Sequence, residues 1–292
     1  MILTGHCVDV IGTLPEASVQ AVVTSPPYWQ LRDYGSDPVR WSDGWVGKLG
    51  EEGTPSQFVE HLIEVFRSVR RVLKPNGTMW VNLGDTYVSS RADPSVRPRS
   101  LAGIPWRFAL AMMADGWILR QEIIWEKPNA MPEPPRKRCT RCHEHIFLFS
   151  LDSDYVWNHS AMQEPAIYAG TARTGFAKWR DMPGHGGLRY GSEIGELRIR
   201  RSVWRVAHEV SSAAHFAQFP PDLVRPMIQA STREGDTVLD PFSGAGTTVL
   251  VAEEQGRIGI GIEINPAYVG IAEQRIPLRL DLMSPTSDER NE

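Results

Sequence analysis

The sequence predicts an α/β fold built on a mostly parallel, doubly wound sheet, and three observations point to it. Short apolar runs of strand length alternate along the chain with longer segments whose apolar residues recur at helical spacing. Two of the short runs end in loops that carry Pro or Gly, at residues 24–28 and 240–248. With 292 residues, 41% of them hydrophobic, the chain can bury the core of one large domain or of one domain with an insertion.

The first half of the chain contains the clearest periodic segments. The helix at 55–73 is indicated by apolar residues at helical spacing, followed by a Pro-Asn-Gly stop at 75–77. The stretch 35–54 is rich in Gly, Asp and Trp without periodicity, which predicts a long mobile loop. The complete expectation is strands at 19–24, 78–83, 118–125 and 146–150, and helices at 55–73 and 104–114.

The pattern dissolves between residues 152 and 205 into Gly, Arg, His and aromatic residues, so we expect an inserted recognition region there. Order then resumes, with helices expected at 220–230, 247–255 and 266–275 and strands at 237–239 and 257–262. The chain is therefore divided into two halves of one fold (1–151 and 206–280), the insert (152–205) and a polar tail (281–292).

Charge is distributed unevenly along the chain. The net charge is only −4, yet basic residues gather locally while acidic residues concentrate around 43–52 and in the tail. Such a distribution can build a positive cleft on an acidic body, although for any one cluster a solvated surface is the simpler interpretation. The basic clusters are Arg91, Arg97, Arg99 and Arg107; Arg136, Lys137, Arg138 and Arg141; and Arg198, Arg200, Arg201 and Arg205.

The cysteines and the N-terminus indicate the cellular compartment in which the protein is expected. Three cysteines cannot form a disulfide framework, no apolar run reaches about 18 residues, and the first residues do not read as a secretory signal. We therefore expect a cytoplasmic protein without a membrane partner. Cys139 and Cys142 form half of a zinc pattern, but a second well-spaced pair is missing, so no metal site is predicted.

The two special loops differ in the chemistry that they offer. The loop Asp240-Pro-Phe-Ser-Gly-Ala-Gly-Thr-Thr248 brings glycines to the end of a strand and the start of a helix, which favours close approach of backbone to a nucleotide-like cofactor. It matches neither the dinucleotide nor the P-loop glycine spacing. The loop Thr24-Ser-Pro-Pro-Tyr28 presents a hydroxyl, rigid carbonyls and an aromatic ring. That set suits a flat polar group such as a base.

In this order and spacing, the two motifs resemble those of the amino-methylating DNA methyltransferases, which use S-adenosylmethionine. More narrowly, the chain resembles the permuted (β-class) group, in which the catalytic motif precedes the cofactor motif. The resemblance runs from about residue 3 to 276 and is weakest between 152 and 205. It implies a permuted Rossmann-like methyltransferase fold with a catalytic half, a target-recognition insert and a cofactor half. It also implies double-stranded DNA as substrate, with a cognate restriction endonuclease and a homodimer as further partners.

The residues of the first loop fit attack by an exocyclic amine. The lone pair of such an amine is delocalised, and acceptors for its hydrogens can draw the nitrogen towards tetrahedral geometry. We expect the Ser25 hydroxyl and the Pro26 carbonyl to be these acceptors, Pro27 to fix the direction of the carbonyl, and Tyr28 to stack on a flipped base. Methyl transfer is then a direct displacement without a covalent enzyme intermediate.

The identity of the target base rests on finer points. Methylation of the cytosine ring carbon needs a thiolate after proline, and no cysteine of this chain follows a proline. By resemblance, Ser before Pro-Pro-Tyr is more typical of enzymes that methylate cytosine N4 than of those that methylate adenine N6. We therefore expect a cytosine-N4 enzyme. The alternatives are an adenine-N6 enzyme, a methyltransferase acting on RNA or a protein amide, and a DNA-binding module without activity.

On the cofactor side, Glu263 ends the strand that follows the glycine loop and is expected to bind the ribose hydroxyls. His6 stands near where relatives carry an acidic residue that contacts the adenine, and either His6 or Asp9 is expected to take over that contact. Phe219 lies in a segment that closes over the methionine end in relatives. The expected cofactor-binding residues are Asp240, Phe242, Ser243, Gly244, Gly246, Thr247, Glu263, Asn265, Phe219 and His6.

Residues on the DNA side are expected around the base pocket and in the insert. Trp29 is expected to add to the wall of the pocket. Trp125 either packs behind the base or is an ordinary core residue, and Lys127 is placed to meet a phosphate. The expected DNA and base-pocket residues are Trp29, Trp125, Lys127, Arg138, Arg141, His143, Arg198 and Arg200.

Overall fold

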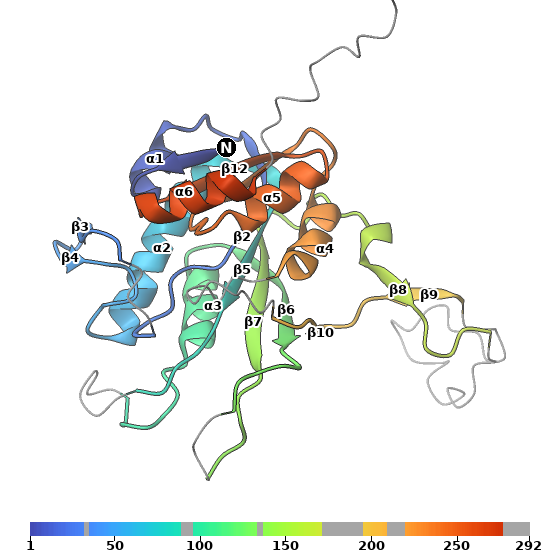
Figure 1. Ribbon diagram of the computed structural model, residues 1–292, viewed down its shortest axis with the longest axis horizontal. Coiled ribbons are helices and arrows are strands. Elements are labelled where there is room, and N and C mark those ends of the chain that lie inside the picture. Colours follow the sequence, from blue (N-terminus) through green and yellow to red (C-terminus); the bar gives the residue numbers. More distant parts are fainter. Residues whose placement is uncertain (32–34, 89–95, 133–136, 171–194, 209–219, 277–292) are drawn as a thin grey trace, which may run out of the picture.

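The computed structural model describes residues 1–31, 35–88, 96–132, 137–170, 195–208 and 220–276. In these ranges the chain forms an eight-stranded central sheet with helices on both faces, as Figure 1 shows. The order of the strands across the sheet is β1-β12-β11-β2-β5-β7-β6-β10. The expected α/β architecture with a mostly parallel sheet is confirmed.

The elements agree closely with the periodic segments of the sequence. The sheet contains β1 (Ile2–Thr4), β2 (Val19–Thr24), β5 (Leu73–Leu83), β6 (Ile118–Glu126), β7 (His143–Ser150), β10 (Val203–Arg205), β11 (Thr237–Asp240) and β12 (Ile258–Glu263). The α-helices are α1 (Cys7–Thr13), α2 (Pro55–Val72), α3 (Ile104–Ala114), α4 (Pro221–Ser231), α5 (Thr247–Glu254) and α6 (Pro266–Arg275). Two small hairpins and a 3-10 turn complete the described part: β3 (Val39–Arg40) with β4 (Val46–Gly47), β8 (Gln163–Pro165) with β9 (Leu197–Ile199), and Ser160–Met162.

Strand direction places the functional loops at one edge. Neighbouring strands from β1 to β5 are parallel, and β10 is parallel to β6. Strand β7 runs antiparallel to both of its neighbours, β5 and β6. Because β7 is reversed, its first residues lie at the same edge as the last residues of β5 and β6. Residues at the start of β7 can therefore reach a site formed at the ends of the parallel strands.

Two hydrophobic cores cover the two faces of the sheet, since successive side chains of a strand point to opposite sides. Along β5, Met79 and Val81 join the core that contains α1, α2 and α3, whereas Trp80 joins the core that contains α4 and part of α5. Along β7, Phe147 and Phe149 face the first core and Ile146 and Leu148 the second. The central runs of β5 (Met79 to Val81) and of β7 (Ile146 to Phe149) are thus buried on both faces, which explains why these runs are continuously apolar.

Several segments differ from the sequence-based expectation. The Pro-Asn-Gly stop expected at 75–77 lies inside β5, which begins at Leu73 directly after α2. Residues 35–54 were expected to be a long mobile loop, but they contain the β3–β4 hairpin, and Trp41 is buried against α2. The insert was expected to extend to residue 205, yet β10 pairs with β6 in the central sheet. Strand β1 and helix α1 have no counterpart in the expectation because both are short. Phe219 lies outside the described residues, as do 171–194 of the insert and the tail.

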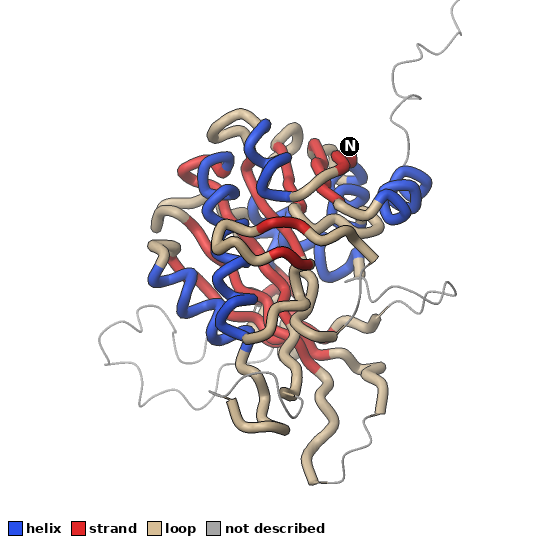
Figure 2. The backbone as a smooth tube through the Cα atoms, turned by 90° about the vertical axis from the view of Figure 1, so that its left-hand side faces the viewer, coloured by secondary structure: helices blue, strands red, loops and turns tan. Residues whose placement is uncertain are grey.

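The described parts of two long connections, 84–103 after β5 and 127–142 after β6, project at the same end of the molecule in Figures 1 and 2. Arg138 links them, with its guanidinium 4.0 Å from the ring centroid of Tyr87. Among the described helices, none is both long and apolar enough to cross a membrane.

Candidate active site

The two special loops lie side by side in the structure. Strand β2 delivers the Ser-Pro-Pro-Tyr loop and the neighbouring strand β11 delivers the glycine loop, with Leu239 paired to Val22. The Thr24 hydroxyl donates a hydrogen bond of 2.6 Å to Asp240 Oδ1, just before each loop leaves its strand. The end of β2 and the end of β11 are therefore joined directly, and groups bound at the two loops would be close to each other.

Tyr28 is held by its hydroxyl group. The hydroxyl donates to Glu144 Oε2 at 2.5 Å, and Asn82 Nδ2 donates to the same carboxylate oxygen at 2.9 Å. Asn82 Nδ2 also lies 2.8 Å from the Tyr28 hydroxyl oxygen and 3.3 Å from Ser25 Oγ. One amide at the end of β5 thus connects the hydroxyl of Ser25 with the anchor of the Tyr28 ring.

Glu144 is the charged centre of this network. Its side chain is only 14% exposed and forms an ion pair with Lys127, whose ammonium lies 4.3 Å from the ring centroid of Trp125. Burial raises the pKa of Glu144, but the positive charge of Lys127 and the hydrogen bonds that the carboxylate accepts outweigh burial, and the net pKa lies below its ordinary value. The carboxylate is therefore ionised at neutral pH and accepts hydrogen bonds only.

Gly84 completes the support of the Tyr28 ring. A Cβ at this position would lie 2.6 Å from Tyr28 Cε2, so the ring packs directly on the backbone after β5. The sequence places Glu144, with His143, among the candidates for the pocket or for DNA contact, but it does not single out Gly84. The run Asn82-Leu-Gly-Asp85 at the end of a strand was a usable signal for Gly84. Asp85 itself has a structural role, because its carboxylate accepts from the backbone N–H groups of Thr86 and of the residues that begin α3.

The glycine loop is organised by backbone amides that donate to carboxylates. Gly244 N donates to Glu263 Oε2 at 2.8 Å, Asn265 N donates to Glu263 Oε1 at 2.7 Å, and Phe242 N donates to Asp240 Oδ1 at 3.1 Å. Burial raises the pKa of Asp240 to about 6 and also raises that of Glu263. The Asp240 side chain is 1% exposed, so it faces Thr24 and the loop backbone, not an open pocket.

The loop leaves space at its glycines. Gly244 has a φ of +51°, and no atom of the described residues lies within 4 Å of the place a Cβ would take. The Ser243 hydroxyl is buried and finds no hydrogen-bond partner in the described part of the chain. An open backbone cradle beside this hydroxyl and the Glu263 carboxylate fits the polar edge of a nucleoside. Gly246 (φ +78°) and Thr247 lie behind it, packed towards α6.

His6 lies next to this cradle, because Gly5 N donates to the Glu263 carbonyl and Thr4 pairs with Glu263. Burial lowers the pKa of His6, against the attraction of Asp9. Its Nε2 is buried without a hydrogen-bond partner among the described residues. A neutral imidazole with one unused nitrogen is available to a ligand at this position.

Two of the residues expected at the base pocket, Trp29 and Trp125, lie in the hydrophobic cores. Trp29 is 1% exposed and its Nε1 donates to the Glu52 carbonyl at 2.8 Å, so the expectation of a pocket wall is wrong: the ring belongs to the core on the α2 side. Trp125 is also 1% exposed and donates to the Val206 carbonyl, in agreement with its alternative as a core residue behind Lys127.

The remaining expected DNA-side residues fall into two groups. Arg141 donates to the Asp85 carbonyl, and Arg138 and Arg141 both approach the ring of Tyr87 at the rim of the site, where His143 is exposed at the start of β7. Arg198 and Arg200 lie on or beside β9, paired with Glu164 of β8, in a hairpin that stands apart from the loops at 84–103 and 127–142 (Figure 1). No cluster of three or more His, Cys, Asp or Glu that could bind a metal occurs in the described ranges.

Comparisons with known proteins agree with this geometry. The model of the N6/N4 methyltransferase family, described as DNA methylase, matches residues 19–274. The chain is 41% identical to the Type II methyltransferase M.XycI of Xanthomonas campestris pv. cyanopsidis, over 93% of this chain and 86% of that protein. It is 38% identical to the Type II methyltransferase M.Cfr9I of Citrobacter freundii, with the same coverage.

Solved structures show the same fold. The PvuII DNA methyltransferase, described as cytosine-N4-specific, superposes with a TM-score of 0.67 at 21% identity, covering 95% of this chain and 86% of that one. A putative DNA modification methylase of Thermus thermophilus, solved with S-adenosyl-L-methionine, gives a TM-score of 0.61 at 25% identity and covers 94% of both chains. From the family match and the curated relatives, the chain belongs to the N6-adenine and N4-cytosine DNA methyltransferase family.

Proposed function

We propose that this protein transfers a methyl group from S-adenosylmethionine to the exocyclic N4 of a cytosine flipped out of double-stranded DNA. The observation that carries the proposal is the arrangement around Asn82, which ties Ser25 Oγ to the Tyr28 hydroxyl beside the open glycine cradle. Within the family, the choice of cytosine rests on Ser25 before Pro-Pro-Tyr, which resembles the motif of cytosine-N4 enzymes.

The base-side residues have distinct roles in this proposal. Ser25 Oγ and the Pro26 carbonyl accept the hydrogens of the target amine, which exposes the nitrogen lone pair, and Pro27 restricts the loop backbone. Tyr28 stacks on the base with its second face supported by Gly84 and its hydroxyl tied to Glu144. The ring is therefore held in place before the base arrives, which reduces the cost of ordering it on binding.

The cofactor-side residues fit S-adenosylmethionine, which when bound supplies an electrophilic methyl group. The Glu263 carboxylate has acceptor capacity left for ribose hydroxyls beyond its two backbone N–H bonds. Gly244 gives close access to the backbone, and Ser243, Asn265 and His6 contribute polar groups around it. Asp240 supports the loop from within through Thr24 and Phe242 N, and Phe242, Gly246 and Thr247 shape it.

DNA is proposed to bind across the rim formed by the connections 84–103 and 127–142. Lys127, Arg138 and Arg141 gather there, and we assign them to contacts with phosphates around the flipped base. Arg198 and Arg200 are assigned to sequence readout from the β8–β9 hairpin. Because the relatives are named Type II methyltransferases, a cognate endonuclease that reads the same site is the proposed partner in the cell.

The first experiment is product analysis. Purified protein is incubated with tritiated S-adenosylmethionine and unmethylated duplex DNA of varied sequence, and the digest is analysed by nucleoside mass spectrometry. We expect N4-methylcytosine. N6-methyladenine would overturn the base assignment while keeping the site, and no product despite measured cofactor binding would point to an RNA or protein substrate or to a binding module.

A further inference from the structure

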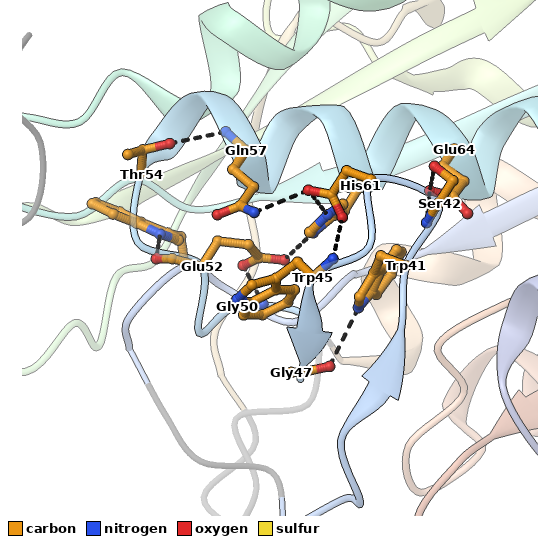
Figure 3. A network of polar contacts seen from close by, with 12 residues as sticks. Trp41, Ser42, Trp45, Gly47, Gly50, Glu52, Thr54, Gln57, His61 and Glu64 are labelled. Atoms are coloured by element: carbon orange, nitrogen blue, oxygen red, sulfur yellow. Dashed lines mark hydrogen bonds and ion pairs between the residues drawn. The ribbon is translucent and has the colours of Figure 1, made fainter.

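The segment between β4 and α2 contains a carboxylate that the proposed reaction does not use. Glu52 is 0% exposed. Its Oε2 accepts a hydrogen bond of 2.8 Å from Gly50 N, and its Oε1 lies 2.8 Å from His61 Nδ1 on α2 (Figure 3). A fully buried carboxylate is costly unless it is paired and hydrogen-bonded, so its surroundings must hold it firmly.

His61 provides that pairing. Its side chain is 3% exposed. Its ring stacks on the indoles of Trp41 and Trp45, which lie beside it in Figure 3. The centroid of the His61 ring lies 4.3 Å from that of Trp41 and 5.2 Å from that of Trp45. Its Nε2 lies 3.3 Å from Asp43 Oδ2, so each ring nitrogen faces a carboxylate. Burial lowers the pKa of His61, but the bonds and charges of Glu52 and Asp43 outweigh burial and raise it overall. The two carboxylates therefore favour the protonated imidazole more than water does.

The backbone that Glu52 holds lies directly behind the target-base loop. Gln30 N donates to the Gly50 carbonyl at 2.7 Å, and Trp29 Nε1 donates to the Glu52 carbonyl at 2.8 Å. A Cβ on Gly50 would lie 3.0 Å from the Tyr28 carbonyl oxygen. The loop is thus supported from behind by residues 50–52, while the far end of the Tyr28 side chain is tied to Glu144.

We propose that Glu52, clamped by His61, is a positioning residue for methyl transfer: it fixes the backbone of residues 50–52, which in turn holds the backbone of residues 28–30 so that the Tyr28 ring meets the flipped base. The inference rests on the proposed stacking role of Tyr28. A hydrophobic side chain at position 52 would fill the core without donating or accepting, and it would leave Gly50 N without its carboxylate acceptor. In this proposal the cost of burying the pair is offset by the single loop geometry that it specifies.

The test compares Glu52→Gln with the matched control Glu64→Gln. Glu64 lies on α2, like His61, and binds the same hairpin through Ser42, but has no contact with residues 28–30 among the described interactions. Each variant is assayed for kcat, for KM towards DNA and for cofactor affinity by calorimetry. A duplex with 2-aminopurine at the base that product analysis identifies as methylated reports flipping by fluorescence.

We expect Glu52→Gln to lower kcat by about tenfold and to change the fluorescence of the flipped base, because a displacement of about 1 Å is enough for such a loss. Cofactor affinity should stay within about twofold, and Glu64→Gln should match the wild type in every assay. Unchanged kcat and fluorescence in Glu52→Gln, or an equal loss in Glu64→Gln, would overturn the inference.

A double-mutant cycle with Tyr28→Ala separates this inference from the proposed function. If Glu52 acts through Tyr28, then Glu52→Gln has no further effect on kcat in the Tyr28→Ala background. If the two substitutions instead lower kcat by factors that multiply, Glu52 does not act through Tyr28. That result would overturn the positioning role and leave the role of Tyr28 intact. Full activity and normal flipping in Tyr28→Ala alone would overturn the proposed stacking role of Tyr28, and this inference with it, whereas failure of the proposed reaction itself would show in the product analysis.

A second pair of variants keeps the test valid if Glu52→Gln folds poorly. His61→Gln retains an N–H donor for Glu52, whereas His61→Leu fills a similar volume beside the two indoles and donates nothing. We expect His61→Gln to retain several times the kcat of His61→Leu at equal cofactor affinity. Equal values of kcat in the two variants would contradict the proposal.

Discussion

The two loops of the site are held in different ways although their strands are neighbours. The target-base loop is fixed by side chains: the Tyr28 hydroxyl binds Glu144, and Asn82 bridges Tyr28 and Ser25. The cofactor loop is fixed by backbone, since Gly244 N and Phe242 N donate to Glu263 and Asp240 and its glycines leave open space. One loop depends on the identity of its side chains, and the other depends on the absence of side chains.

This difference predicts different kinds of failure. On the base side, isosteric changes that alter one hydrogen bond should lower the rate of methyl transfer and leave cofactor binding unchanged. On the cofactor side, adding a single carbon atom should weaken cofactor binding strongly, whereas removing the buried charge of Asp240, which faces away from the open cradle, should be tolerated. The following variants test that division, from the largest expected effect to the smallest.

The largest effect is expected for Tyr28→Ala. Loss of the stacking ring should lower kcat by about 10² to 10³-fold with unchanged cofactor affinity, because the base is no longer held in a reactive position. Tyr28→Phe keeps the ring but loses the hydroxyl, with its hydrogen bonds to Glu144 and Asn82, so a loss of about tenfold is expected. Single-turnover methylation of duplex DNA measures both. Equal inactivity of the two variants would show that the hydroxyl, not the ring, carries the function.

On the cofactor side, Gly261→Ala in β12 should weaken S-adenosylmethionine binding by about 10²-fold or more. The added Cβ would lie 2.3 Å from Ser243 Oγ and 2.6 Å from Ile2 Cδ1, so the start of the glycine loop must move. Gly270→Ala is the matched control, because a Cβ there meets no atom of the described residues within 4 Å. Calorimetric titration with cofactor gives the affinities, and tight binding by Gly261→Ala would contradict a backbone-built cradle.

An intermediate effect is expected for Lys127→Gln, which removes the positive charge beside Glu144. The pKa of Glu144 is lower in the folded protein than in the unfolded chain. The stability that its charged form provides is therefore present above the unfolded pKa and is lost as the pH falls through the folded pKa. Without Lys127 that loss occurs at higher pH. The acid limb of the kcat profile should therefore move upward, while Lys137→Gln, an exposed lysine of the same connection, leaves it in place. If kcat depends on pH in the same way in the two variants, Lys127 does not keep Glu144 ionised, and the proposed role of this ion pair is wrong.

The smallest effect is expected for Asp240→Asn. An asparagine oxygen can still accept from Thr24, and the variant lacks the buried charge. The pKa of Asp240 is raised to about 6, so the wild type binds a proton more readily when folded and loses stability as the pH rises from about 4 through about 6. The variant should gain a few degrees in Tm relative to the wild type at pH 8 and little at pH 4. Thermal melts of both proteins without cofactor measure this. A difference in Tm between variant and wild type that does not change with pH would contradict a raised pKa of Asp240.

Much of the fold was predictable because its signals are local. Helices α3 and α6 have the boundaries that their periodicity predicted, and β2 and β11 end at the two motifs. The short elements β1, α1 and β10 have three to seven residues, and no periodic pattern in the sequence marks them. The order of the hairpin in 35–54 leaves no local signal in the sequence, because it comes from stacking of Trp41 and Trp45 on His61, which belongs to a separate helix.

Site residues next to a motif were the hardest to assign. Trp29 directly follows Tyr28, yet Tyr28 binds Glu144 and Trp29 binds the Glu52 carbonyl in the core. No sequence pattern distinguishes these two aromatic rings, because the direction of each side chain depends on the backbone beyond the proline pair and on what packs there. Glu144, a weak candidate from sequence, became central because β7 reverses direction and brings its first residues to the end of β5.

The sequence by itself determined the α/β class, the two loops, their chemistry and the family to which the chain belongs, because these depend on the types and order of residues within short windows. Only the tertiary structure decided which side chains hold the target-base loop. Tyr28 and Glu144 are 116 residues apart, and the Glu52 carboxylate is linked to the target-base loop through the backbone of Gly50, whose carbonyl accepts from Gln30 N. Such contacts follow from strand register and packing across the whole domain, and short-range periodicity does not specify either of them.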